Sequence, residues 1–179
     1  MLLAPGFEEI EAITIVNVLR RAGIEVTLAG TQAGPVEGTR QVRVVAEVSM
    51  EGMSGLNFDM IFLPGGQPGT DNLRKAEPVS RILEEALSAG RFVAAICAAP
   101  SILAERGYLK GKRAASHPSV RSALHAAGAQ DSDLPVVVDG LFVTSRSPGT
   151  AMDCAVTMVQ CLLGPTAGDA VKAQLIAAC

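Results

Sequence analysis

Aromatic residues are scarce in this chain of 179 residues: it has no tryptophan and one tyrosine, and aromatics make up 3%. Hydrophobic residues nevertheless account for 49%, so the core must be built mainly from Ala, Val, Leu and Ile. This length and composition are typical of one α/β domain whose sheet is covered by helices.

Positively charged residues are not in excess, because the chain has 15 Lys and Arg but 18 Asp and Glu, for a net charge of -3. We therefore expect no specific binding to nucleic acid and no attraction to an anionic membrane.

The chain opens with Met1-Leu2-Leu3-Ala4-Pro5-Gly6. This segment has no basic region and is too short for a signal peptide or a membrane span. We expect a cytoplasmic protein whose first strand is short.

The four cysteines form no CxxC pair, and only His117 and His125 are available to complete a metal site. A disulfide framework is not expected in such a chain, and we predict no metal and no other cofactor. Cys154 and Cys161 are seven residues apart on a predicted helix, which favours core positions on one face. Cys179 is terminal, and we expect it to be mobile.

Strand-like and helical segments alternate along almost the whole chain. Strands are predicted at 1–4, 24–29, 58–63, 91–96 and 111–116, helices at 8–22, 69–89, 147–163, 167–178 and from 100 onward, and hairpins within 31–50 and 136–144. The alternation predicts an α/β fold with a doubly wound, mostly parallel sheet. Such sheets bind ligands beyond the carboxyl ends of their strands.

Cys97 follows the strand at 91–96 and precedes a helix that begins near Pro100. The start of a helix supplies unpaired N–H groups and partial positive charge, which favour the reactive thiolate. The position therefore indicates a nucleophile. The alternative is a buried structural cysteine in an alanine-rich core, which is the commoner role of a cysteine.

Two further segments should reach the same edge of the sheet. The turn Pro64-Gly65-Gly66 follows the strand at 58–63, and one of its N–H groups could form an oxyanion hole with the N–H of Ala98. Such a turn also occurs as ordinary loop punctuation. His117 precedes Pro118 at a strand end, where its imidazole could face the site or merely satisfy a loop.

Three glutamates begin the first predicted helix. The favourable interaction of carboxylates with the helix dipole explains Glu8 and Glu9 adequately. Glu11 precedes a mostly apolar stretch and could point inward, where a desolvated carboxyl would keep its proton and hydrogen-bond a thiolate. The alternative for Glu11 is an exposed surface position.

Four segments carry a resemblance to a known family, namely 4–12 (APGFEEIEA), 63–66 (LPGG), 94–100 (AAICAAP) and 144–150 (TSRSPGT). In this order and spacing the chain resembles the ThiJ/PfpI superfamily, in the branch of the Parkinson-disease-associated protein deglycase and its bacterial homologues. The resemblance implies a flavodoxin-like sandwich and a single ThiJ/PfpI-type (class I glutamine amidotransferase-like) domain over 1–179. It also implies a homodimer whose interface includes the first helix.

The resemblance also assigns roles to residues. It implies that Cys97 is an easily oxidised nucleophile, that Glu11 is its protonated partner, and that His117 lies nearby. It implies further positions as follows: Gly66 and Ala98 in the oxyanion hole, Gly65 and Pro148 in the binding site, and Arg21 and Arg40 near the pocket across the dimer interface. Ser147 stands where relatives often have glycine, and 119–135 matches poorly, which leaves the outer wall of the pocket undefined.

The function implied is that of a cofactor-independent cysteine enzyme acting on reactive dicarbonyls such as methylglyoxal, or on their early glycation adducts. This is a glyoxalase III or deglycase activity. The alternative is a redox-responsive stress-protection or chaperone-like protein that senses oxidants through Cys97. A cysteine peptidase is less favoured, because Ala98 follows the cysteine where the PfpI-type peptidases have histidine.

Overall fold

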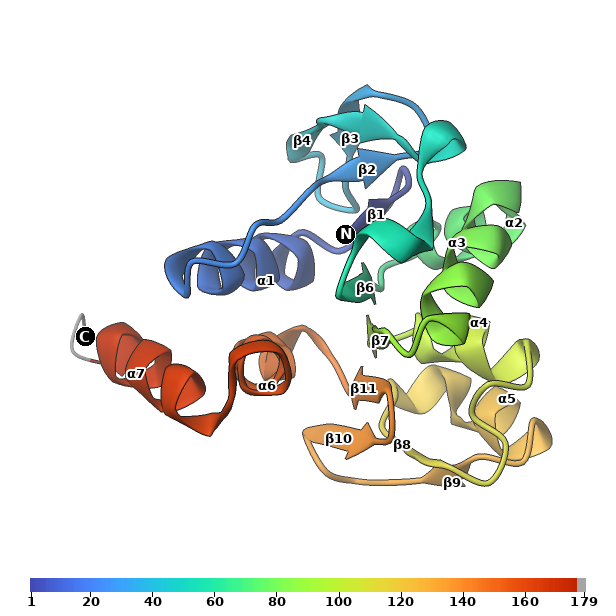
Figure 1. The fold of residues 1–179 in the computed structure, drawn as a ribbon. Helices are drawn as coiled ribbons and strands as arrows, with labels where there is room; N and C mark the ends of the chain where they lie inside the picture. The colour runs from blue at the N-terminus through green and yellow to red at the C-terminus, as the bar shows by residue number, and fades with distance from the viewer. Residues whose placement is uncertain (177–179) are drawn as a thin grey trace.

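The structure is a computed structural model that describes residues 1–176, so Cys179 and its expected mobility lie outside the described part. A central sheet separates two layers of helices (Figure 1). One layer holds α1 (Glu9–Arg21), α6 (Ala151–Leu163) and α7 (Pro165–Ile176), and the other holds α2 (Gly69–Lys75), α3 (Glu77–Ser88), α4 (Pro100–Glu105) and α5 (Arg121–Ala126). The predicted α/β sandwich is confirmed.

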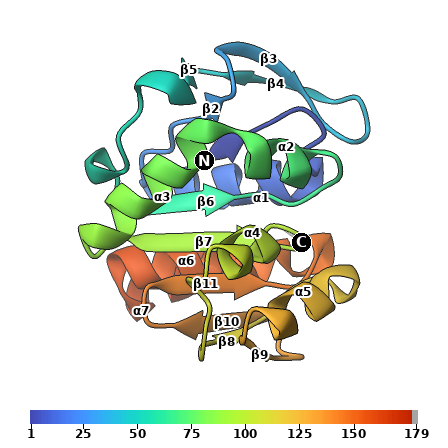
Figure 2. The same ribbon diagram turned by 90° about the vertical axis from the view of Figure 1, so that its right-hand side faces the viewer.

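The sheet is mostly parallel. At one end, β1 (Leu2–Leu3) pairs with β2 (Ala29–Gly30), which pairs with β5 (Val48–Ser49). β1 also lies against β6 (Met60–Leu63), and from there the order continues to β7 (Phe92–Ile96), β11 (Phe142–Ser145) and β10 (Val136–Asp139). Figure 2 shows the part from β6 through β7 and β11 to β10, and within residues 1–176 only the edge strand β10 of this sheet is antiparallel. The chain starts in the middle of the sheet and builds outward on both sides, which is the doubly wound arrangement.

Short elements complete the chain. The hairpin of β3 (Gly34–Glu37) and β4 (Arg43–Ala46) lies outside the main sheet, as the sequence predicts. β8 (Arg113–Ala114) pairs with β9 (Gln130–Asp131) in a separate parallel ladder. Single 3-10 turns occur at η1 (Met50–Gly52), η2 (Gly55–Asn57), η3 (Pro118–Val120) and η4 (Pro148–Thr150).

β7 is buried on both faces because its side chains alternate between two cores. Val93 and Ala95 belong to the cluster under α3 and α4, whereas Ala94 and Ile96 belong to the cluster under α1 and α6. All are fully buried. A strand enclosed in this way reads as a continuous apolar run, which is why the sequence identifies it.

Three predicted elements differ from the structure. The strand expected at 111–116 is paired only at Arg113–Ala114, with β9 and not within the main sheet. The helix expected at 69–89 is divided into α2 and α3, because Ala76 is extended at ψ 114° and Pro78 stands in the first turn of α3. The strand expected at 24–29 is paired only at Ala29–Gly30, because β1, its neighbour, has only two residues.

Among the described residues, no helix is both long and apolar enough to cross a membrane.

Candidate active site

Cys97 occupies the turn between β7 and α4 in a left-handed backbone conformation, with a φ of 63°. This conformation is strained for a residue with a side chain and is found mainly where neighbours enforce it. Here the N–H of Cys97 donates to the carbonyl of Ser145 at 2.9 Å, and its carbonyl accepts from the N–H of His117 at 2.8 Å. The ends of β7, β11 and β8 therefore fix the turn at the carboxyl edge of the sheet.

Glu11 reaches the same place from the first turn of α1 and is fully buried. Its Oε2 accepts the N–H of Gly65 at 2.7 Å, and its carboxyl also hydrogen-bonds the side chain of Cys97. Its Oε1 is buried and has no hydrogen-bond partner within residues 1–176. The expected inward orientation is what the structure shows, although the role of Glu11 remains a prediction.

Gly65 is the residue against which both side chains pack. A Cβ placed on Gly65 would lie 2.6 Å from the Cβ of Cys97 and 2.8 Å from Oε2 of Glu11. Both distances are shorter than van der Waals contact, so only glycine allows the turn to approach this closely. The absence of a side chain at Gly65 therefore allows Cys97 and Glu11 to lie close together.

Burial governs the protonation of this pair. It raises the pKa of Glu11 to about 7, against the opposing hydrogen bond from Gly65. Burial also raises the pKa of the Cys97 thiol to about 12, and the charge of Glu11 adds to the shift. The sequence led us to expect a lowered thiol pKa, but the enclosure of the turn outweighs its N–H groups while Glu11 is charged.

The pair holds a single proton over the range bounded by these two pKa values, about 7 and about 12. If that proton resides on Glu11, the carboxyl is neutral and can donate to the sulfur. The negative charge that opposes the thiolate is then absent. The arrangement thus permits the thiolate and neutral carboxyl that the sequence analysis expects.

Two backbone N–H groups complete the surroundings of the sulfur. The N–H groups of Ala98 and Gly66 hydrogen-bond Cys97 and lower the pKa of its thiol. They come from the turn after β7 and the turn after β6. The structure therefore brings together the two donors that were expected to form an oxyanion hole.

His117 lies beside Cys97 through its backbone, and its side chain is engaged elsewhere. Nδ1 lies 2.8 Å from the hydroxyl of Ser119 and accepts the Ser119 N–H at 3.3 Å. The imidazole thereby caps η3, which agrees with the alternative that His117 satisfies a loop. Among the described residues, no hydrogen bond joins the imidazole of His117 to the thiol of Cys97.

The predicted binding residues lie at different distances from the site. Pro148 begins η4, shortly after Ser145, and is half-buried. Arg40 is exposed on the turn between β3 and β4, whose backbone is held by Glu9. Arg21 is exposed in the last turn of α1, about 15 Å along the helix from Glu11 at 1.5 Å per residue. Within one chain, Arg21 is thus remote from Cys97.

Two residues have contacts that the sequence analysis missed. Glu8 caps α1 by accepting the N–H of Glu11 at 2.8 Å, which fixes the helix start that carries Glu11. Glu9 is buried and binds the turn of the hairpin rather than solvent. The dipole explanation covered neither contact, because their partners are not visible in the local pattern.

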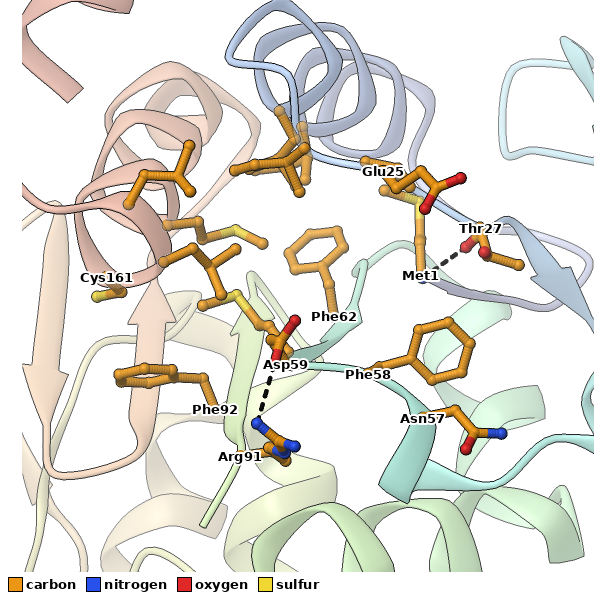
Figure 3. A pocket seen from close by; sticks show the side chains of 18 of the residues that line it. Met1, Glu25, Thr27, Asn57, Phe58, Asp59, Phe62, Arg91, Phe92 and Cys161 are labelled. Carbon is orange, nitrogen blue, oxygen red and sulfur yellow. Dashed lines mark hydrogen bonds and ion pairs between the residues drawn. The ribbon is translucent and has the colours of Figure 1, made fainter. Parts of the chain in front are cut away.

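Both other described cysteines lie on α6; burial raises the pKa of the Cys154 thiol, and the charge of Glu11 adds to the shift, so Cys154 is close to the site. Cys154 is fully buried in α6, as expected, whereas Cys161 is half-buried. Cys161 lines a cavity of about 520 Å³ at the amino ends of β6 and β7, together with Phe62 and Phe92 (Figure 3). Cys97 follows the carboxyl end of β7, so it and this cavity lie at opposite edges of the sheet.

Within residues 1–176, no group of three or more His, Cys, Asp or Glu side chains is arranged to hold a metal ion.

The described residues thus form a flavodoxin-like α/β sandwich in which a cysteine at a strained strand-to-helix turn lies beside a buried carboxyl. The sequence model of the DJ-1/PfpI family matches residues 1–161. The chain belongs to the DJ-1/PfpI family, which confirms the resemblance seen in its sequence motifs.

Individual relatives agree with this assignment. Protein dj-1beta of Drosophila melanogaster is 40% identical over 92% of this chain and 88% of its own length. The crystal structure of the Drosophila melanogaster DJ-1beta superposes with a TM-score of 0.92 at 38% identity, covering 98% of this chain and 95% of that one.

Two relatives bear the names of activities. The glutathione-independent glyoxalase DJR-1.2 of Caenorhabditis elegans is 34% identical over 88% of this chain and 84% of its own length. A deglycase of Pyrococcus abyssi is 35% identical over 83% of this chain and 89% of its own length.

Proposed function

We propose that this protein is a cofactor-independent thiol enzyme that converts reactive dicarbonyls such as methylglyoxal, or their early glycation adducts, into hydroxy acids. The observation that carries the proposal is the hydrogen-bonded pair of Cys97 and Glu11, enclosed beside two backbone N–H donors. The names of the nematode glyoxalase and the archaeal deglycase support the same chemistry.

The reaction begins when the sulfur of Cys97 attacks the aldehyde carbon and forms a C–S bond. The resulting oxyanion is stabilised by the N–H groups of Ala98 and Gly66 and takes the proton of Glu11, which gives a hemithioacetal and leaves Glu11 as a carboxylate base. Glu11 supplies the acid and base steps that follow. It removes the proton from the former aldehyde carbon and returns it to the adjacent carbon, while the hydroxyl proton of the hemithioacetal passes to the adjacent carbonyl oxygen, so that the thioester of a 2-hydroxy acid forms. Water then hydrolyses the thioester, and the hydroxy acid and free thiol are released.

The decisive experiment measures lactate formed from methylglyoxal by the purified protein. We expect saturable turnover in the unmodified protein and none above background in Cys97→Ser. Cys161→Ser is the matched control, because it removes another half-buried thiol from the opposite edge of the sheet. Equal turnover in Cys97→Ser and the unmodified protein would exclude this function.

A homodimer belongs to the proposal. Ile10 and Ile13 on α1 are 58% and 46% exposed, and Val42 and Val45 of the hairpin are 49% and 63% exposed. Such large apolar side chains on one helix and the adjoining hairpin are suited to an interface between copies. A second copy would also bring Arg21 within reach of a site from which it is remote in its own chain.

Redox sensing is the second candidate, because Cys97 is only partly buried and has N–H donors available to hold oxygen atoms on its sulfur. A sensor would gain chaperone-like or protective activity only after oxidation, whereas the enzyme would lose turnover.

We further propose that residues 1–179 form a single domain and that the protein resides in the cytoplasm, where a reactive thiol stays reduced.

A further inference from the structure

Glu9 is a carboxylate buried at the start of α1, with 7% of its surface exposed. Acidic side chains in the first turn of a helix normally face solvent. Here the hydroxyl of Thr39 donates to Oε2 at 2.8 Å, and the N–H of Arg40 donates to Oε1 at 2.5 Å. Both oxygens of Glu9 therefore hold the turn between β3 and β4.

The turn is shaped to receive this carboxylate. A Cβ on Gly38 would lie 2.5 Å from Oε1 of Glu9, so a side chain at position 38 would displace it. The N–H of Thr39 adds a bond of 2.9 Å to the carbonyl of Phe7. Thus 38–40 is anchored to 7–9 at several points, although 30 residues separate Glu9 from Thr39.

Glu9 is ionised in this setting. Burial is the largest single influence and acts to raise its pKa, but the hydrogen bonds to the carboxylate together lower it, and those from the Arg40 N–H and the Thr39 hydroxyl contribute most. Hydrogen bonds to a charged acceptor are roughly twice as strong as those between neutral groups. The contact is therefore suited to hold a loop in one conformation.

We propose that Glu9 is a positioning residue that fixes the β3–β4 turn and so presents Arg40 to the active site. Arg40 itself is exposed, and its guanidinium contacts only the carbonyl of Thr39 among the described residues, at 3.3 Å. Glu11, the partner of the nucleophile, lies two residues further along the same helix start. The arginine and the catalytic pair are thereby tied to one rigid element. The inference rests on the proposed function, and the segment that holds the turn reaches the site through the N–H of Glu8, which donates to the carbonyl of Gly65 at 2.9 Å.

The test compares Glu9→Ala, Glu9→Gln and Glu37→Ala. Glu37 forms an exposed ion pair with Arg43 at 2.9 Å in the same hairpin, so its removal is a matched control that leaves the turn intact. Hydrogen exchange of the Arg40 amide reports directly on the bond to Glu9. We expect exchange to be roughly tenfold faster or more in Glu9→Ala, little changed in Glu37→Ala, and intermediate in Glu9→Gln, which keeps an acceptor oxygen.

Kinetics then separate positioning from general damage. We expect Glu9→Ala to raise KM for methylglyoxal by about the same factor as Arg40→Ala, with kcat nearly unchanged, and the double variant to add little to either. Additive effects, or an equal fall of kcat and kcat/KM, would overturn the proposal, as would unchanged exchange of the Arg40 amide. An unmodified protein without turnover refutes the proposed function instead, and the exchange experiment still decides whether Glu9 holds the turn.

Discussion

The carboxylate of Glu11 accepts the peptide N–H of Gly65 at 2.7 Å, although the two residues are 54 positions apart. This bond fixes the carboxyl group by a backbone donor, which has fewer ways to move than a side chain. It also leaves the carboxyl free to exchange a proton with Cys97. The chemical consequences of the pair can therefore be tested through pH, through Gly65 and through the cysteine itself.

The pair makes activity depend on pH. The doubly protonated pair has no base and no thiolate, and it loses its first proton near the pKa of Glu11, about 7. We expect kcat/KM for methylglyoxal to rise as pH increases through about 7 and then to level off. Steady-state rates in overlapping buffers check this. A profile that is flat across neutral pH would contradict the assignment of Glu11.

The raised pKa of Glu11 also predicts a pH-dependent stability. The folded state binds the proton more tightly than the unfolded chain, whose carboxyl titrates near 4.5. The contribution is therefore fully present below pH 4.5 and is lost as pH rises through about 7. It amounts to about 3 kcal/mol at ~1.36 kcal/mol per pKa unit.

Urea unfolding at about pH 5 and about pH 8 measures this contribution. The free energy of unfolding should fall between these values more in the unmodified protein than in Glu11→Gln, which cannot titrate. Parallel pH dependences in the two proteins would show that Glu11 has an ordinary pKa.

Replacement of Gly65 should damage the site without unfolding the protein. In Gly65→Ala the new methyl group would meet Cys97 and Glu11, and displacement of reacting groups by about 1 Å can cost roughly 100-fold in rate. Gly52→Ala is the control, because no atom of residues 1–176 lies within 4 Å of a Cβ at that position. Lactate assays and thermal unfolding of both variants give the comparison. Full activity in Gly65→Ala would mean that the close approach has no catalytic importance.

Mild peroxide should modify Cys97 before the other described cysteines. Cys154 is fully buried, and Cys161 lacks both a carboxyl partner and the N–H donors that surround Cys97. We expect a sulfinic acid at Cys97, identified by intact mass and peptide mapping. Earlier oxidation of Cys154 or Cys161 would count against a special reactivity of the turn.

A charge at Ile13 should separate the proposed dimer. Ile13 is 46% exposed, so Ile13→Lys can be accommodated in the monomer but not in an apolar interface. Val16 on the same helix is a poorer probe, because it packs partly against the core and its replacement would confuse dissociation with unfolding. Light scattering checks the mass, and a monomeric unmodified protein at micromolar concentration would remove the dimer from the proposal.

The sequence predicts the parts of this fold that depend on continuous apolar patterns. The strand before Cys97 and the helix that carries Glu11 are both found, because the strand is a continuous apolar run and the buried face of the helix recurs with a helical period. The break at Ala76 was missed although Pro78 signals it, since Leu73, Ala76 and Val79 keep a helix-like spacing across the break. Pattern alone favours one helix where local backbone geometry requires two.

The candidate site was predictable to the extent that its residues follow strands. Cys97, Gly66 and Ala98 meet because the carboxyl ends of parallel strands share an edge. The contact of Glu9 with Arg40 could not be foreseen, because no local pattern relates a helix start to a distant turn. The raised pKa of Cys97 was likewise inaccessible, because it depends on how completely the fold encloses the thiol.

The alternation of β7 between two cores means that the position of the nucleophile is determined from both sides of the sheet. A change in volume under Ala95 on one face, or under Ile96 on the other, would be transmitted along the same short strand to the turn at Cys97. Substitutions deep in either helical layer can thus retune the reactivity of the thiol without contacting a substrate. Variation in the interior of this chain is therefore a route to altered chemistry as much as to altered stability.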